Sequence, residues 1–186
     1  MQDISVKGEA RWFTDDDLVA LRDYWDIYER HYEELQQQIF EWAQGHPALG
    51  AALAAVPPDE LDRQSQQSRR LISQAIATGD FSHYAQHSRP QGVFYATLGI
   101  RFGDWFEFVG WYGRLMLPRL GAALQHDPPR MLRAIAAMQR FLDRTLSELG
   151  DTYIATKEAA LQASEQRFRL LIDAIGKPGS NIAFMM

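Results

Sequence analysis

His83 and His87 have the spacing of a metal-binding pair. Residues four apart lie on one face of a helix, so the two imidazoles could share a metal ion, with Asp80 as a third ligand. A zinc site in a protein needs three or four ligands, and the sequence offers no partner motif. Pro90 follows closely and limits the segment to a turn or two. We therefore interpret the pair as part of a solvated polar loop and predict no metal site.

Tyr95 is the second residue with chemical potential, and it stands in the apolar stretch from Gln91 to Leu120. A phenol can bind a metal ion only after it loses its proton, and tyrosine normally titrates near pH 10. A cationic neighbour would have to lower that pKa. Arg101 follows six residues later, about 240° around a helix, and is poorly placed to do so. Tyr95 is therefore expected to be a core or pocket aromatic with a satisfied hydroxyl.

Arg63, Arg69 and Arg70 form a small basic group beside a glutamine-rich stretch, a pattern typical of the solvated face of a helix. The acidic pair Glu33 and Glu34 has no partner in a pocket, and no glycine-rich phosphate loop follows a strand. The sequence contains no cysteine, which excludes thiol catalysis, disulfides and cysteine-ligated zinc. We predict no catalytic residues and do not expect this segment to be an enzyme.

The composition is that of an ordinary globular chain, with 46% apolar and 23% charged residues among 186. The formal net charge of −5 gives no general reason to expect nucleic-acid binding. The N-terminus lacks the apolar segment of a secretory signal. Charged residues interrupt the most apolar region, Gly92 to Leu124, so no stretch of about 20 residues suits a membrane span. A cytoplasmic location is expected.

Apolar residues recur at helical spacing in nearly every segment, and no segment alternates over the length of a strand. The sequence therefore predicts an all-α fold. In the first half of the chain, helices are expected from Thr14 to Gly45, over 48–56 and from Pro58 to Thr78. A short turn at 82–87 is expected to precede a helix over 91–102. A further helix is expected to begin at an Asp104 cap, and the last one at Asp127.

The last expected helix is longer than one compact domain needs. No proline interrupts the chain between Pro129 and Pro178, and about 45 helical residues would span about 65 Å. Leu161, Phe168 and Ile175 follow at seven-residue steps, the repeat of paired coiled-coil helices. The surplus length is expected to leave the domain and to transmit a conformational change.

Two motifs resemble the globin domains of globin-coupled sensors. The segment YATLGI at 95–100, followed by Trp105 and Phe106, is similar to the family's His-x-x-Ile-Gly-Leu and aromatic pair. In that family the histidine is the proximal haem ligand. The second motif is Ile39-Phe40 ahead of HPAL at 46–49, which matches an aromatic pair before an Asn-Pro-x-Leu helix end. The resemblance covers roughly residues 14–149.

The resemblance implies a globin-like fold around a haem-sized pocket, with Tyr95 at the ligand position and Phe40 where the family has its distal tyrosine. Both departures imply no haem, as in the haem-free globin domains of bacterial stress-signalling complexes. The pocket at the haem position would be lined by Tyr95, Phe40, Leu71, Leu98 and Trp111, and filled by side chains or by an apolar small-molecule ligand. One alternative is a haem-based oxygen or gas sensor with an unusual axial ligand such as Tyr95. Another is a helical dimerisation scaffold that senses nothing.

The segment from Ser164 to Ile175 resembles the entry helix of PAS domains, which implies a downstream signalling domain. Four parts are therefore expected: an N-terminal extension (1–13), a globin-like sensor domain (14–150), a coiled-coil signalling helix or PAS start (151–175), and a tail (176–186) that is vector-derived or begins a truncated neighbour.

The last two helices are expected to pair with a second copy in a four-helix homodimer core. The expected function is an N-terminal sensory and dimerisation module of a bacterial signalling protein of the PAS, histidine kinase or diguanylate cyclase type.

Overall fold

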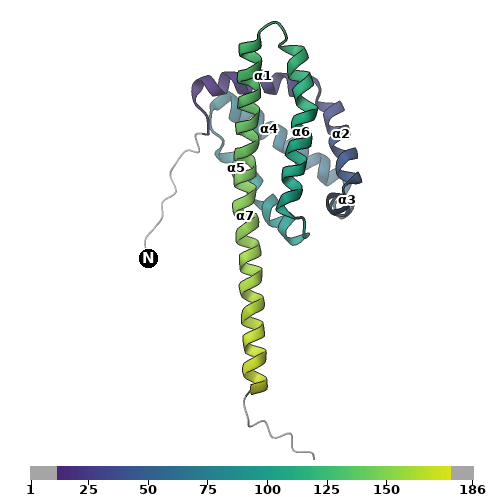
Figure 1. Ribbon diagram of the computed structural model, residues 1–186, viewed down its shortest axis with the longest axis vertical. Coiled ribbons are helices and arrows are strands. Elements are labelled where there is room, and N and C mark those ends of the chain that lie inside the picture. The colour runs from purple at the N-terminus through teal and green to yellow at the C-terminus, as the bar shows by residue number, and fades with distance from the viewer. Residues whose placement is uncertain (1–11, 177–186) are drawn as a thin grey trace, which may run out of the picture.

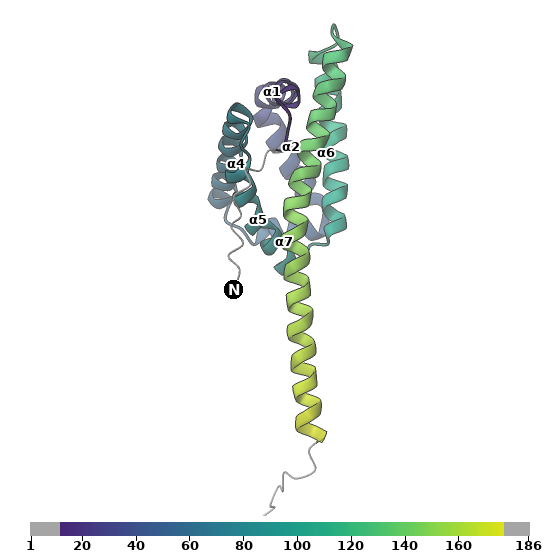
Figure 2. The same cartoon turned by 90° about the vertical axis from the view of Figure 1, so that its left-hand side faces the viewer.

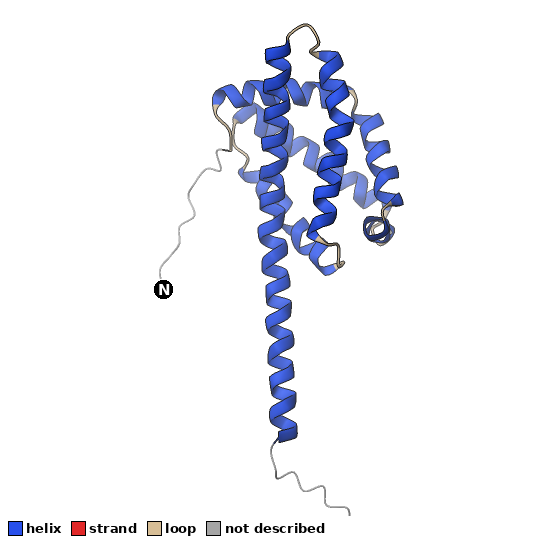
Figure 3. Cartoon of the chain, in the orientation of Figure 1, coloured by secondary structure: helices blue, strands red, loops and turns tan. Residues whose placement is uncertain are grey.

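Seven helices make up the part of the chain that the computed structural model describes, residues 12–176, and no strand occurs there (Figure 3). The helices are α1 (Asp15–Arg30), α2 (Tyr32–Gly45), α3 (Pro47–Ala54), α4 (Pro58–Thr78), α5 (Ser82–Thr97), α6 (Phe102–Ala123) and α7 (Pro128–Gly176). The predicted all-α fold is confirmed. Most of the expected N-terminal extension, and all of the expected tail beyond residue 176, lie outside the described residues.

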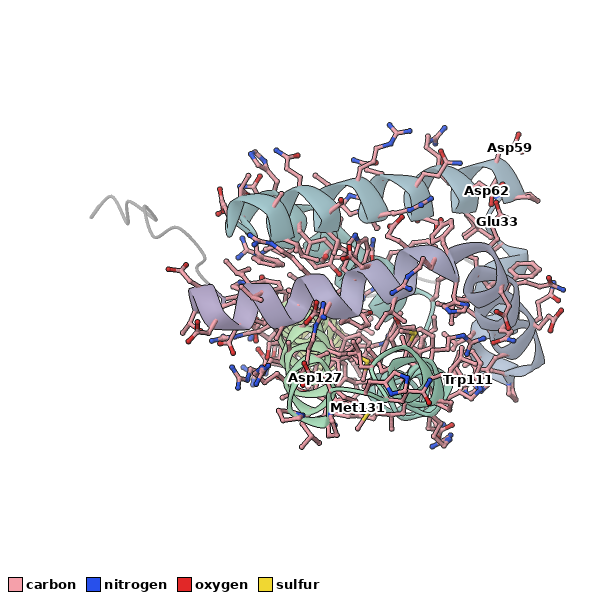
Figure 4. The ribbon with its side chains drawn as sticks, turned by 90° about the horizontal axis from the view of Figure 1, so that it is seen from above. Glu33, Asp59, Asp62, Trp111, Asp127 and Met131 are labelled. Atoms are coloured by element: carbon pink, nitrogen blue, oxygen red, sulfur yellow. The ribbon has the colours of Figure 1, made fainter. Side chains whose placement is uncertain are left out.

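The body has three layers, because α1 lies between α4 on one side and the pair α6 and α7 on the other (Figure 4). α6 and α7 run antiparallel and are joined by a turn at residues 124–127 (Figure 1). α5 follows the end of α4 and packs on α7, with the most extensive contact between any two of the described helices. α2 lies beside α6, where Trp42 stacks on Trp111.

The prediction of one helix from Thr14 to Gly45 is wrong, because this segment forms two helices, α1 and α2, that meet at His31. Its start is as expected: the Thr14 hydroxyl accepts a hydrogen bond from the Asp17 amide, in a reciprocal capping box. At the break, the Tyr32 hydroxyl reaches Ser65 of α4 at 3.0 Å, and Gln36 binds the same serine. These long-range hydrogen bonds stabilise a corner that the apolar spacing does not mark.

Two boundaries in the middle of the chain also differ from expectation. The short turn expected at 82–87 is part of one continuous α5, with Pro90 inside the helix. An internal proline costs about 3 kcal/mol, and the packing of α5 along α7 offsets this cost. Asp104 is not the N-cap residue of α6 but lies in its first turn, because the helix begins at Phe102 with Arg101 as its N-cap. The Asp104 carboxylate accepts a hydrogen bond from the Arg101 amide instead.

Two apolar clusters fill the interior. The larger cluster joins α1, α2, α4, α5, α6 and α7, and its most buried members are Leu21, Ile27, Leu35, Phe81, Met116, Leu120, Ala134, Ala137 and Met138. The smaller cluster joins α2, α3 and the connection from α5 to α6, through Ala43, Leu49, Ala52 and Ile100. Tyr95 belongs to the smaller one, whereas Leu71 and Trp111 pack against the larger one.

The long final helix is confirmed, since α7 has 49 residues. Its first half packs in the body, where Thr152 hydrogen-bonds to the Arg89 carbonyl and Tyr153 packs against Phe102. Every residue from Lys157 to Asp173 is exposed, as is Ile175, and this outer half extends beyond the body in both views (Figures 1 and 2). None of the described helices combines the length and apolar character that crossing a bilayer requires.

Candidate functional site

Tyr95 lies in the last turns of α5, where the helix approaches the start of α6. Its ring packs against Trp105 with centroids 4.6 Å apart and against Phe94 at 5.6 Å. No protein group in residues 12–176 hydrogen-bonds to its hydroxyl, and that hydroxyl is not among the fully buried polar atoms that lack a partner. The residue is a partly buried aromatic that packs against the smaller cluster.

Burial raises the pKa of Tyr95 to about 12, and the nearby Tyr84 adds to the increase. A pKa two units above the ordinary value of 10 favours the neutral phenol by about 3 kcal/mol. No cation contributes to the shift, and the Arg101 guanidinium binds Asp104 instead. The environment of Tyr95 therefore disfavours the phenolate form, which is the form that haem iron would bind.

A chain of aromatic contacts runs from Tyr95 along one side of α6. Trp105 contacts Phe108 with ring centroids 5.9 Å apart, and Phe108 contacts Tyr112 at 6.1 Å. The Tyr112 hydroxyl then meets the Tyr24 hydroxyl of α1 at 2.6 Å. This aromatic chain links the smaller cluster to the centre of the larger one, so a displacement at Tyr95 has a packed route to α1 and α6.

The other four predicted pocket residues differ in burial and in their contacts. Phe40 is 44% exposed and Leu98, just after α5, is 39% exposed. Leu71 of α4 is half-buried at the edge of the larger cluster. Trp111 joins the aromatic chain indirectly, through Phe108 at 6.2 Å. A shared pocket for the five residues stays a prediction.

A close contact between α5 and α7, which the sequence reasoning missed, lies one turn before Tyr95. Gly92 is buried against α7, and a Cβ at this position would overlap the Thr152 hydroxyl and the Leu149 carbonyl oxygen. The Thr152 hydroxyl donates to the Arg89 carbonyl at 3.0 Å, and Arg89 pairs with Glu148 at 2.9 Å. A glycine inside a helix is the sequence feature that could have indicated this contact.

The histidine pair lies on α5 rather than in a loop, which corrects that interpretation. His83 is exposed, whereas His87 is half-buried and bonds Ser68 of α4 at 2.9 Å. Burial lowers the pKa of His87. Asp80 caps the turn before α5 by accepting a hydrogen bond from the Ser82 amide. Among the described residues, no three histidine or acidic side chains gather into a metal site.

Arg69 is not simply solvated, although Arg63 and Arg70 are exposed as predicted. Its guanidinium makes a bidentate contact with Glu29 of α1, with one Nε to oxygen distance of 2.8 Å. It also lies 4.0 Å from the centre of the Tyr32 ring. Arg69 thus ties α4 to the corner between α1 and α2, beside an open groove of about 390 Å³.

No protein-family model matches the chain, and no curated protein matches it either. The resemblance to globin-coupled sensors therefore rests on the quoted sequence motifs alone and stays a prediction.

Proposed function

We propose that this chain is the sensory and dimerisation module at the N-terminus of a bacterial signal-transduction protein, with a globin-like fold that works without haem. The observation that carries the proposal is the contact of Gly92 with Thr152. It fixes the helix that bears Tyr95 to α7 at the level where α7 leaves the body. A change near Tyr95 would therefore act on the base of the exposed half of α7.

The haem-free part is supported by the chemistry of the two positions that the resemblance assigns to haem. Tyr95 is held as a neutral phenol by burial. Phe40 has no hydrogen-bond donor for a bound gas and is 44% exposed. The signal would instead be a change in packing of the smaller cluster, caused by an apolar ligand or by conditions that alter that packing.

The dimerisation part is supported by apolar side chains left exposed on the last two helices. Phe106 and Leu117 of α6 are 59% and 40% exposed, and they share a face because eleven residues are close to three full turns. On α7, Ile154, Leu161 and Phe168 are exposed at seven-residue steps. Two copies joined along these faces would bury them in a coiled-coil arrangement.

The mechanism has two packings of the dimer in equilibrium. Displacement of Tyr95 moves α5, α5 moves α7 through the contact of Gly92 with Thr152, and the paired outer halves of α7 change their relative position. A ligand or condition shifts this equilibrium only by the difference in its interaction with the two packings. A PAS, kinase or cyclase domain downstream would respond to the change.

Spin labels on the outer half of α7 test this coupling. The sequence has no cysteine, so Gln162→Cys gives one label per copy, and pulsed dipolar spectroscopy reports the distance between copies. Tyr95→Ala, which empties space beside Trp105, is expected to shift or broaden that distance distribution. Val93→Ala, on the exposed side of the same helix, should leave it unchanged. A folded Tyr95→Ala dimer with the wild-type distribution would reject the coupling.

Haemin titration tests the haem-free assignment. Absorbance near the Soret region is expected to show no stoichiometric, protein-shifted band. Such a band, abolished by Tyr95→Phe, would establish the haem-based alternative instead. A thermal-shift screen of apolar small molecules addresses the scaffold alternative, because a ligand that binds only the folded state raises the melting temperature.

A further inference from the structure

Trp25 carries a buried hydrogen-bond donor with no acceptor. The residue is 6% exposed, and its indole Nε1 is the one fully buried side-chain nitrogen or oxygen without a partner among the described residues. Its ring is held by stacking on Tyr28, with centroids 4.7 Å apart. Buried polar groups in proteins are almost always paired with protein or with ordered water. A free indole N–H in a packed interior therefore indicates a missing acceptor.

The hydroxyl pair of Tyr24 and Tyr112 leaves a second hydrogen-bond donor unused. The hydroxyls of Tyr24 and Tyr112 form one hydrogen bond at 2.6 Å. Two hydroxyl groups bring two protons, and one bond between them uses only one. Neither hydroxyl makes another hydrogen bond within residues 12–176. Burial holds the pKa of both phenols well above the ordinary value, so both protons stay in place at any physiological pH.

The two surplus donors belong to adjacent residues of the same cluster. Tyr24 and Trp25 are consecutive in α1, both belong to the larger cluster, and their ring centroids are 6.4 Å apart. No lysine, arginine or histidine is buried in the described part of the chain. An anion would have no countercharge there, and burying an unpaired charge is costly. The missing partner is therefore neutral and accepts hydrogen bonds.

We propose that the larger cluster holds a neutral oxygen acceptor, which takes a hydrogen bond from Trp25 Nε1 and a second one from the Tyr24–Tyr112 pair. One oxygen atom with two lone pairs satisfies both donors. A buried water fits this chemistry, since such waters typically bridge otherwise unpaired polar groups. The carbonyl or hydroxyl oxygen of a small apolar molecule fits it equally. This site lies on α1, away from Tyr95, and does not depend on the globin resemblance.

Indole N–H spectroscopy of the full chain tests the proposal. Labelling tryptophan with ¹⁵N gives one indole cross-peak for each of the five tryptophans. The Trp25 peak is assigned by its loss in Trp25→Phe or, if that variant fails to fold, by its nuclear Overhauser contacts to the stacked Tyr28 ring. The proton is expected at the downfield position of a hydrogen-bonded indole. An upfield position, typical of a free indole, would overturn the proposal.

Two further measurements identify the acceptor and its second donor. A cross-peak between the Trp25 indole proton and water indicates a buried water. A downfield indole proton without that cross-peak, together with a small molecule released on denaturation and detected by mass spectrometry, indicates a bound ligand. Tyr112→Phe removes one hydroxyl of the pair and is expected to shift the Trp25 peak. Tyr153→Phe, a matched change on α7, should not, and equal shifts in both variants would exclude the tyrosine pair as the second donor.

Discussion

The buried carboxylate of Asp104 fixes the start of α6, which the pattern of apolar residues alone does not determine. Asp104 is fully buried, and its carboxylate accepts hydrogen bonds from the Arg101 amide at 3.0 Å and from the Arg101 guanidinium at 2.7 Å. The hydrogen bond from Arg101 holds the pKa of Asp104 below its usual value. This carboxylate sets the start of α6 directly beside the ring of Trp105.

Asp104→Asn is expected to destabilise the fold at neutral pH by about 1 kcal/mol, the usual scale for a helix-capping group. Because the folded-state pKa is lowered, the contribution of Asp104 is complete above the ordinary carboxyl pKa and is lost as the pH falls through the folded-state pKa. Urea unfolding of the wild type and of Asp104→Asn over a pH series measures the difference in their free energies of unfolding. The two stabilities should converge at acid pH, and a constant difference would contradict the assignment.

Arg69→Gln is expected to cost about 1 kcal/mol, because it removes both the contact with Glu29 and the cation–π contact with Tyr32. Arg70→Gln changes the same charge at the adjacent, exposed position and should have little effect. Chemical denaturation of the two variants compares them directly. Equal stabilities would mean that Arg69 is only a solvated residue.

Helix pairing in this chain depends on where small residues allow close approach. α5 and α7 meet at Gly92, and α7 carries Gly150 opposite Phe102, where a Cβ would lie 2.8 Å from the end of the ring. From propensity alone, alanine at position 150 would favour the helix by about 1 kcal/mol. The ring contact opposes that gain, so the glycine there is explained by packing.

Gly92→Ala is expected to destabilise the protein by about 2 kcal/mol, because the new methyl group overlaps backbone and side-chain atoms of α7. Gly113→Ala is the matched control: nothing lies within 4 Å of its added Cβ. That control should stabilise α6 by about 0.5–1 kcal/mol. Thermal unfolding of both variants gives the comparison, and a neutral Gly92→Ala would show that α5 and α7 are not in close contact.

Sequence patterns predicted the helices better than they predicted which helices pack against one another. Capping at Thr14, the stop at Gly79 and the length of α7 follow from local chemistry and were correct. The corner at His31 and the continuous helix through Pro90 were not, because long-range contacts decide them. For the candidate site, the sequence marked Tyr95 as a core or pocket aromatic, and the residue packs against the smaller cluster. The sequence could not show the Gly92 contact, the role of Arg69 or the unpaired Trp25, which depend on which helices become neighbours.

At the scale of the whole molecule, the main feature is the imbalance between the packed body and the exposed half of α7. Leu161, Phe168 and Ile175 are 62%, 64% and 84% exposed. A lone helix of this length gains little from propensity, and most helix stability in proteins comes from packing an apolar face. Pairing with a second copy is the arrangement that we propose for these residues.

Leu161→Glu is expected to shift the chain from dimer towards monomer, because it puts a charge in the proposed seam of each copy. Gln162→Glu adds the same charge one position away, outside the seven-residue series, and should leave the dimer intact. Light scattering coupled to size-exclusion chromatography over a concentration series reports the mass. A wild-type chain that is monomeric at all concentrations would refute the dimer, and equal masses for the two variants would place its seam elsewhere.

The continuity of α7 has a geometric consequence. Between Thr152 and the end of the helix there is no proline or break, so the residue count alone sets the azimuth of every later side chain relative to the body. One residue inserted between Thr156 and Leu161 would rotate all that follows by about 100°, whereas seven would restore the original orientation to within about 20°. Under the proposed signalling role, the output of length variants of this helix should therefore repeat with a period of seven residues.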